Sequence, residues 1–155
     1  MDTNTPQSND SKLATAERLA DITFDLLERC AEKREQVATK VGLTVAEFKA
    51  LRNFGANERL SVGELARRLE LSSSRLTRIL DGLVEQGLVT REIGTDDRRL
   101  MELRLTDKGR AMKSRLGEQY VKTHLEIISH LPEGGANSVV YALEHLRDAM
   151  KDWSK

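Results

Sequence analysis

Residues 60–109 constrain the fold of this chain more than any other part of its 155-residue sequence. They contain two helical patterns separated by a few residues, followed by two short strand patterns on either side of a charged turn. This order is typical of a winged helix-turn-helix. We therefore expect a mainly α fold with a small β-hairpin wing, to which Leu60 adds a short third strand.

The second of these helices carries the candidate DNA contacts. Ser72 is placed as its N-cap and Gly87 as the glycine that ends it. Its apolar residues recur at i, i+3, i+4 and i+7 from Leu76, which fixes the side that faces the core. The exposed residues of its first turns are then short hydroxyls and two arginines, and acids come only later. The candidate contacts are Ser72, Ser73, Ser74, Arg75, Thr77 and Arg78.

This polarity suits a helix that enters the major groove, because its N-terminal residues meet bases and phosphates, and acids there would be repelled. Asp81 follows Arg78 by three residues and is expected to orient its guanidinium. The alternative is an ordinary solvated helix face, since charged stripes usually are solvated and helix-turn-helix shapes also serve as protein-binding modules.

The residues after this helix favour DNA binding over that alternative. Residues 88–93 and 100–105 alternate apolar and polar side chains and are predicted to be the half-buried strands of one hairpin. The polar turn between them carries Arg98 and Arg99 to its tip. A long basic side chain on such a wing can enter the minor groove, where negative potential is concentrated. Asp97 is expected to brace one of these arginines.

Several of these residues resemble the signature of the MarR family of bacterial transcription regulators. Residues 83–91 (LVEQGLVTR) resemble the family's link from recognition helix to wing, and the resemblance spans the chain in length and helix order. The signature consists of Asp97-x-Arg99, five residues, Leu105-Thr106, two residues and Gly109.

The resemblance implies a homodimeric regulator that binds a pseudo-palindromic site in double-stranded DNA. It implies that Arg99 enters the minor groove with Asp97 as its salt-bridge partner, and that the helix beginning at Ser72 is the recognition helix. It further implies a repressor relieved by a small-molecule effector, a phenolic or aromatic acid ligand, in a crevice whose residues the sequence does not identify. Gly82 departs from the family, which often has a larger polar residue there, and costs roughly 1 kcal/mol of helix propensity.

Charge supports the same interpretation once it is counted by region. The formal net charge of the chain is zero, which alone argues against a nucleic-acid binder. Residues 59–115, however, contain 13 Lys and Arg against 9 Asp and Glu, leaving 12 against 16 elsewhere. The positive charge is therefore concentrated on the helix-turn-helix and wing.

The remaining motifs exclude several classes of protein. One cysteine permits no internal disulfide, and no signal peptide or apolar run approaches spanning length, so we expect a cytoplasmic protein with no membrane partner. No phosphate loop, Gly-x-Ser-x-Gly or His-Glu-x-x-His motif is present, so we expect neither an enzyme nor a cofactor. His124 and His130 face different ways on a helix, so no metal site is predicted.

Three regions are expected along the chain. Residues 1–10 have almost no apolar side chain and are predicted to be a disordered tail. Residues 43–106 form the winged helix-turn-helix DNA-binding domain, and residues 11–42 and 107–155 form a helical dimerisation region. Within them Thr106 is placed to cap a long helix, and two capping boxes are predicted to open shorter ones, Thr44 with Glu47 and Ser61 with Glu64.

The last helix predicts an interface. Its apolar residues are spaced four, three, four and three, which is the seam by which one helix packs along another. A winged unit has no need of three further helices for its own core, so these stripes are expected to pack on one another and on a second subunit. The alternative is burial within one chain. The residues assigned to dimerisation are Leu13, Leu19, Leu131, Val139, Leu143, Leu146, Met150 and Trp153.

Two alternatives from other classes stay open. Cys30 lies on the apolar stripe of the first helix, and some members of the resembled family sense peroxides through a cysteine in that helix. A cysteine on such a stripe is usually inert packing, but a thiol-based redox-sensing regulator remains one alternative. The other is a winged-helix interaction module that does not bind DNA.

Overall fold

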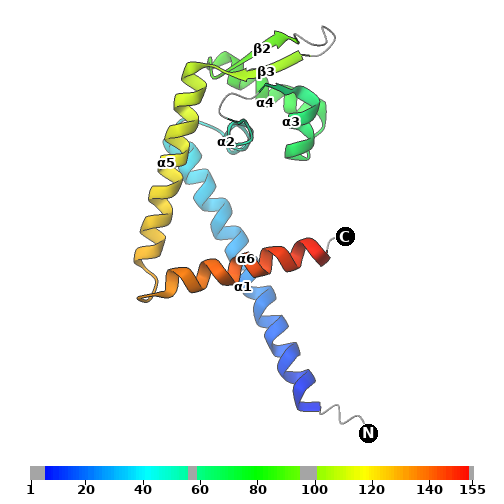
Figure 1. Ribbon diagram of the computed structural model, residues 1–155, viewed down its shortest axis with the longest axis vertical. Helices are drawn as coiled ribbons and strands as arrows, with labels where there is room; N and C mark the ends of the chain where they lie inside the picture. Colours follow the sequence, from blue (N-terminus) through cyan, green and yellow to red (C-terminus); the bar gives the residue numbers. More distant parts are fainter. Residues whose placement is uncertain (1–5, 56–58, 95–100, 154–155) are drawn as a thin grey trace. The chain divides into compact units, whose positions relative to one another are not determined.

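The fold is mainly α-helical with one small antiparallel sheet, as predicted. A computed structural model describes residues 6–55, 59–94 and 101–153, and within these ranges the chain forms six α-helices and three strands (Figure 1). The contacts divide it into two compact units, Met1–Leu116 and Gly117–Lys155. The first unit contains the helix-turn-helix and the base of the wing.

Helix α1 spans Pro6–Lys40 and so begins five residues before the predicted start. Residues 6–10 are therefore helical, and the predicted ten-residue tail is wrong at its C-terminal half. A proline suits the first turn of a helix, where its missing N–H has no partner to lose. Among the α1 side chains whose burial is described, those of Val37 and Ala38 at the C-terminal end are buried, as is Val41 just after the helix, next to α2.

Helix α2, Val45–Arg52, is opened by the predicted capping box. The backbone N–H of Thr44 donates to Oε2 of Glu47 at 2.8 Å, and the N–H of Glu47 donates to Oγ1 of Thr44. Glu47 is nevertheless only 8% exposed, and its Oε1 accepts a 2.8 Å hydrogen bond from Nε2 of Gln86 at the end of α4. A Cβ at Gly82 would lie 2.6 Å from that oxygen. The glycine in α4 therefore makes room for the link between α2 and α4.

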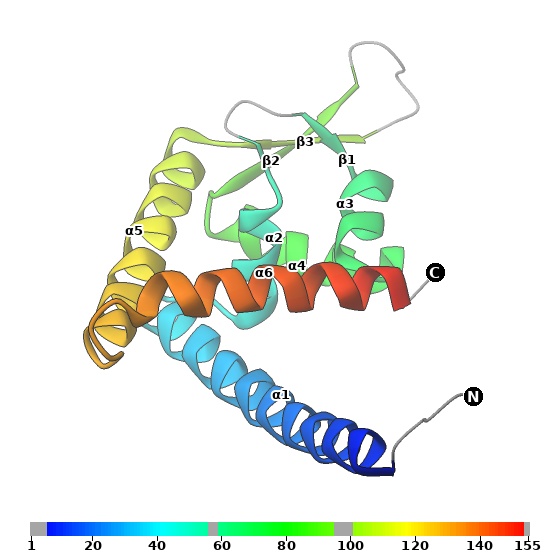
Figure 2. The same ribbon diagram turned by 60° about the horizontal axis from the view of Figure 1, so that its bottom comes forward.

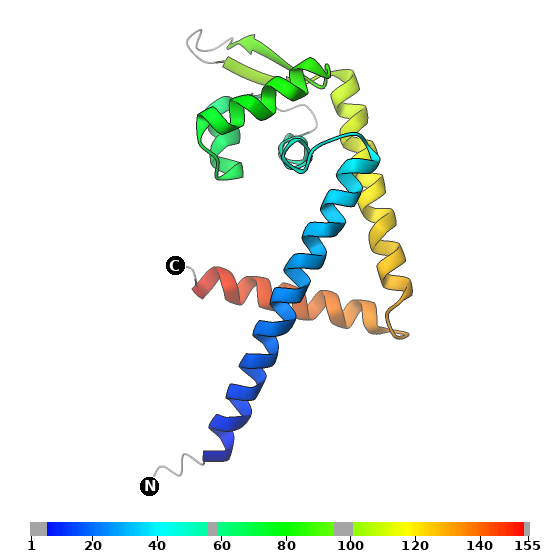
Figure 3. The same cartoon turned by 180° about the vertical axis from the view of Figure 1, so that it is seen from behind.

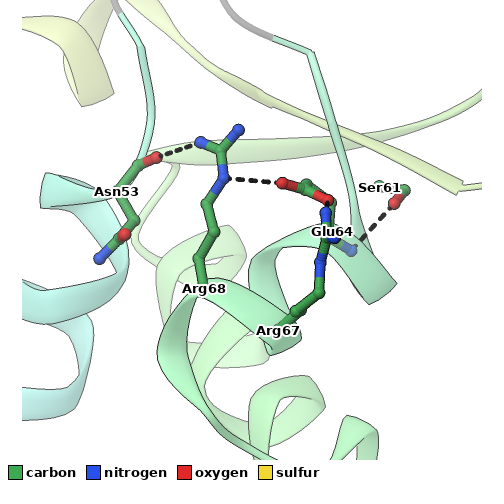
Figure 4. Close-up of polar contacts among 5 residues, drawn as sticks. All are labelled: Asn53, Ser61, Glu64, Arg67 and Arg68. Carbon is green, nitrogen blue, oxygen red and sulfur yellow. Dashed lines mark hydrogen bonds and ion pairs between the residues drawn. The ribbon is translucent and has the colours of Figure 1, made fainter. Parts of the chain in front are cut away.

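Helix α3, Val62–Leu69, has half of its predicted capping box. Ser61 Oγ accepts a 3.0 Å hydrogen bond from the N–H of Glu64, but the carboxylate of Glu64 pairs with the two arginines one turn later. These arginines compete successfully because charge-assisted bonds are stronger than a bond to a neutral N–H. Figure 4 shows Arg68 between Glu64 and the carbonyl oxygen of Asn53, to which its Nη1 donates at 3.0 Å. Arg68 thus links α3 to the end of α2.

Helix α4, Ser73–Glu85, follows α3 after a short turn and lies beside α2 (Figure 3). Ser72 caps it as predicted, and its Oγ accepts a hydrogen bond from the N–H of Arg75. Gly87 follows its C-cap with φ +68°, a conformation that favours glycine. The predicted apolar side is confirmed, because Leu76, Leu80 and Leu83 are fully buried.

The sheet has the strand order β1-β3-β2, and all its pairs are antiparallel (Figure 2). Strand β1 is the short strand predicted at Leu60. The strands are β1, Leu60–Ser61; β2, Val89–Ile93; and β3, Met101–Leu105.

The register of β2 and β3 determines which side chains face the core. Arg91 lies opposite Leu103, between the pairs Val89 with Leu105 and Ile93 with Met101. Directly opposite residues of an antiparallel pair share one side of the sheet, as do residues two apart on a strand. Val89, Leu103 and Leu105 are buried, so this side faces the core at that end of the hairpin, whereas Ile93 and Met101 at the other end are exposed. Arg91 is the one charged residue on it within β2 and β3.

Helix α5, Asp107–Ser129, begins against the end of α4. Thr106 caps it as predicted, because its Oγ1 accepts a 2.9 Å hydrogen bond from the N–H of Gly109. The same hydroxyl donates to the carbonyl oxygen of Gly87 at 2.7 Å. One side chain therefore caps α5 and binds the chain where α4 ends.

Two further contacts complete this α4–α5 junction, which we define as residues 86–88 with residues 106–109. Lys108 Nζ donates to the carbonyl oxygen of Gln86 at 2.7 Å. A Cβ at Gly109 would fall far inside van der Waals contact with the carbonyl oxygen of Leu88. The spacing Leu-Thr-x-x-Gly thus has a local cause, since the hydroxyl and the missing side chain are both needed where the two helices meet.

The second unit contains the end of α5 and helix α6, Gly135–Trp153. The chain breaks between α5 and α6, and Gly134 has φ +73° there. No residue of α6 is buried. Its apolar side chains have no core of their own in a single chain.

Candidate nucleic-acid interface

The N-terminal half of α4 presents the predicted DNA-contacting side chains to solvent. Ser72, Ser73, Ser74, Arg75, Thr77 and Arg78 are all exposed. Within the described part of the chain, no ion pair or hydrogen bond engages the guanidinium of Arg75 or Arg78. Both groups are thus available for phosphates or base edges, which are the usual partners of arginine on DNA.

The backbone of α4 adds to this positive character. Its first turn contains no acidic residue. The free N–H groups and the helix dipole make a helix N-terminus favourable for anions such as phosphate. The acids Asp81 and Glu85 come two and three turns later.

Asp81 does not orient Arg78 as predicted. Its Oδ1 accepts a 2.7 Å hydrogen bond from Nη2 of Arg91, which reaches α4 from the core-facing side of β2. Arg91 pairs with Asp81 in place of Arg78, because the sheet brings Arg91 against α4 whereas Arg78 extends into solvent. The sequence did contain a signal, since Arg91 stands between Val89 and Ile93 at a position where alternation places a buried apolar residue.

The wing is described only at its base. The predicted minor-groove residues Asp97, Arg98 and Arg99 lie outside the described residues. On the outer side of the sheet, Arg59 pairs with Glu102 at 3.6 Å and Arg104 with Glu92 at 3.5 Å. These pairs balance one another, so this part of the wing base adds no net charge.

The residues assigned to dimerisation lie on the surface of the single chain. On α1, Leu13 and Leu19 are exposed, and on α6 the exposure rises to 88% at Trp153. Leu131 and Leu146 are half-buried. Cys30 is exposed on α1 as well. The other exposed members of the predicted interface are Val139, Leu143 and Met150.

The described ranges also bear on metal binding and membrane insertion. Across these ranges no three His, Cys, Asp or Glu side chains gather to hold a metal ion. None of the helices described is both long and apolar enough to cross a bilayer.

Comparison with known proteins bears on the helix-turn-helix and the wing. The model of the MarR family matches residues 41–100. The HTH-type transcriptional regulator SarZ of Staphylococcus aureus is 30% identical over 112 residues, which cover 72% of this chain and 74% of SarZ. The HTH-type transcriptional repressor YetL of Bacillus subtilis is 36% identical over 112 residues, which cover 71% of this chain and 65% of YetL. The chain thus spans a little less than two thirds of YetL.

A solved structure agrees in fold. The structure of reduced AbfR bound to DNA matches with a TM-score of 0.65 and 24% identity, covering 95% of this chain and 99% of AbfR. Together with the helix-turn-helix and its sheet, these similarities define the fold as a winged helix-turn-helix. The chain belongs to the MarR family.

Proposed function

We propose that this protein binds double-stranded DNA as a homodimer and represses transcription until a small phenolic or aromatic acid ligand releases it. The observation that carries DNA binding is the exposed N-terminal half of α4, with its hydroxyls and with Arg75 and Arg78, whose guanidinium groups no described residue engages. Two relatives add support, since YetL is a transcriptional repressor by name and AbfR has been solved bound to DNA.

In this proposal α4 enters the major groove. Ser73, Ser74 and Arg75 lie in its first turn, where a recognition helix meets bases and phosphates. Arg99, braced by Asp97, enters the adjacent minor groove. The charge distribution along the sequence supports both contacts, because the excess of Lys and Arg lies between residues 59 and 115.

The homodimer is supported by apolar surface that the single chain leaves uncovered. None of the apolar side chains of α6 is fully buried, although they repeat at the four-three spacing by which one helix packs along another. A two-fold dimer would place its two recognition helices about 34–36 Å apart on DNA. The bound site would then be a pseudo-palindrome with half-sites one helical turn apart.

Retardation of duplex DNA at low salt tests the function. A pool of random duplexes should be shifted, and repeated selection should enrich a pseudo-palindrome. A protein that shifts no duplex even at low salt would instead be an interaction module on the same fold. Adding salicylate to the bound complex tests the ligand class, and release of the DNA is expected.

Replacing Arg78 with alanine should change which sequences are selected. The guanidinium lies on the exposed side of α4, and a bidentate contact to a base contributes about 1–3 kcal/mol of discrimination. Selection from the random pool should therefore relax at one position of each half-site. Arg115→Ala, which removes an exposed cation on α5, should leave the selected sequence unchanged. Identical winners for wild type and Arg78→Ala would refute base recognition by this residue.

Replacing Arg99 with alanine should weaken DNA binding and reduce its salt dependence. Each lost phosphate-neutralising cation is expected to reduce the slope of log K against log salt by about one unit. Fluorescence anisotropy at several salt concentrations measures this slope. If affinity and slope are both unchanged, the wing tip takes no part in binding.

A further inference from the structure

Arg91 occupies a position that its strand pattern reserves for an apolar side chain. It lies at the edge of the core-facing side of the sheet, between the buried Val89 and the exposed Ile93 and opposite the fully buried Leu103. Its side chain is 29% exposed, and Nε is buried without a hydrogen-bond partner among the described residues. A cation in such a place is partly desolvated, so its contacts have a strong influence on where it can lie.

Both contacts of Arg91 are with the recognition helix. Nη2 donates to Oδ1 of Asp81 at 2.7 Å and to the carbonyl oxygen of Thr77 at 3.2 Å. Thr77 and Asp81 are four residues apart and so lie one above the other on α4. The base of the wing is thus fixed to α4 one turn beyond Ser73, where the candidate base contacts begin.

We propose that Arg91, through Asp81, is a positioning residue that sets the orientation of the wing relative to the recognition helix and thereby contributes to operator selectivity. This inference rests on the proposed DNA-binding function. Adjacent grooves of a duplex have a fixed spacing, so a helix and a wing already held at that spacing lose less conformational freedom on binding. Binding to the preferred DNA site is strengthened most, because only at that site do the recognition helix and the wing both fit their grooves.

Arg91 differs in this respect from the arginines that would touch DNA. Its guanidinium already has a carboxylate partner, whereas those of Arg75 and Arg78 have none within the described part of the chain. A cation neutralised inside the protein releases few counterions from DNA. Loss of Arg91 should therefore change selectivity and leave the salt dependence of binding unchanged.

The test uses Arg91→Gln, Asp81→Asn and the double variant of the full chain. Kd is measured for the selected duplex and for a random duplex over a range of salt. Each single change should weaken binding to the selected duplex about tenfold. The double variant should lose no more affinity than the single variant that binds this duplex more weakly, as expected for two residues that act as one pair. Affinity for the random duplex and the salt slope of Arg91→Gln should match wild type.

Two control variants separate pairing from charge. Glu85→Gln removes an exposed acid from α4 and measures the electrostatic effect of losing a carboxylate near DNA. Arg104→Gln removes a wing arginine whose partner, Glu92, lies within the sheet. Neither should reproduce the loss of selectivity. Thermal unfolding checks that the variants are folded. All variants should have a Tm close to that of wild type, because a partly exposed ion pair contributes little to stability.

Several outcomes would overturn the inference. A fall in salt slope of about one unit for each Arg91 removed would make this residue a phosphate contact. Additive losses in the double variant, or unchanged affinity for the selected duplex, would show that the pair does not act as a unit.

Hydrogen exchange in the free protein gives a readout without DNA. Both single variants should speed exchange at the amides of β2 and β3, and exchange rates equal to those of wild type would overturn the inference. This readout does not depend on DNA binding. Failure of the wild-type protein to bind any duplex would instead refute the proposed function.

Discussion

Replacing Gly109 with alanine is expected to lower the free energy of unfolding by about 3 kcal/mol, the upper end of the usual cost of overpacking. The added Cβ would fall on the carbonyl oxygen of Leu88, and backbone cannot move aside as a flexible side chain can. The first turn of α5 would have to shift, which would also strain the hydrogen bonds of Thr106. Urea unfolding at a fixed protein concentration measures the change.

Gly117→Ala is the matched control for this prediction. Gly117 lies in the same helix, and a Cβ there would meet nothing within 4 Å. Alanine should stabilise the helix at this position by about 0.5–1 kcal/mol, because glycine loses more conformational freedom on folding. The two substitutions are thus expected to act in opposite directions. A similar small effect from both would mean that α5 does not approach Leu88 as described.

Replacing Leu143 with arginine is expected to convert the proposed dimer to a monomer. Leu143 lies on the apolar side of α6, which the single chain leaves exposed. Burying an unpaired charge in an interface costs several kcal/mol, so the dimer dissociation constant should rise about 100-fold or more. Sedimentation velocity across a range of concentrations measures the shift. Operator affinity should fall with it, because a monomer engages only one half-site.

Glu144→Arg introduces the same side chain at the next position of α6, on the exposed polar side. It should leave the dimer intact. A dimer that survives Leu143→Arg would show that this side of α6 lies outside the subunit interface, and another surface would have to account for any dimer observed.

Structure that depends on near neighbours could be predicted from the sequence. Thr44 with Glu47, Ser72, Gly87 and Thr106 all occupy the predicted positions at helix ends. Each satisfies or ends a helix within a few residues of itself, so its spacing along the chain contains the needed information. The burial of Leu76, Leu80 and Leu83 follows from helical periodicity in the same way.

Contacts between residues distant in the sequence could not be predicted in the same way. Glu47 and Gln86 are 39 residues apart, and nothing in either local pattern indicates their hydrogen bond. Asp81 was assigned to Arg78 because the two are one helical turn apart, but the sheet supplies Arg91 instead. Glu64 likewise binds arginines rather than closing a capping box. In each case tertiary packing decided which partner was closer.

Part of the candidate interface remains a prediction from sequence. The exposed side of α4 is where the periodicity of Leu76 and its neighbours placed it. The contributions of Asp97, Arg98 and Arg99 depend on their family resemblance, because these residues lie beyond the ranges described. The dimer contacts likewise depend on spacing and on uncovered apolar surface.

The α4–α5 junction has a consequence for how α4 and α5 can move. Three successive carbonyl oxygens, those of Gln86, Gly87 and Leu88, accept hydrogen bonds from Lys108 or Thr106. Because Gly109 also lies in close contact with the backbone of Leu88, α4 and α5 are tightly packed where they meet. A change in the direction of the first turn of α5 would therefore also displace the C-terminal end of α4, because these hydrogen bonds join the two helix ends directly.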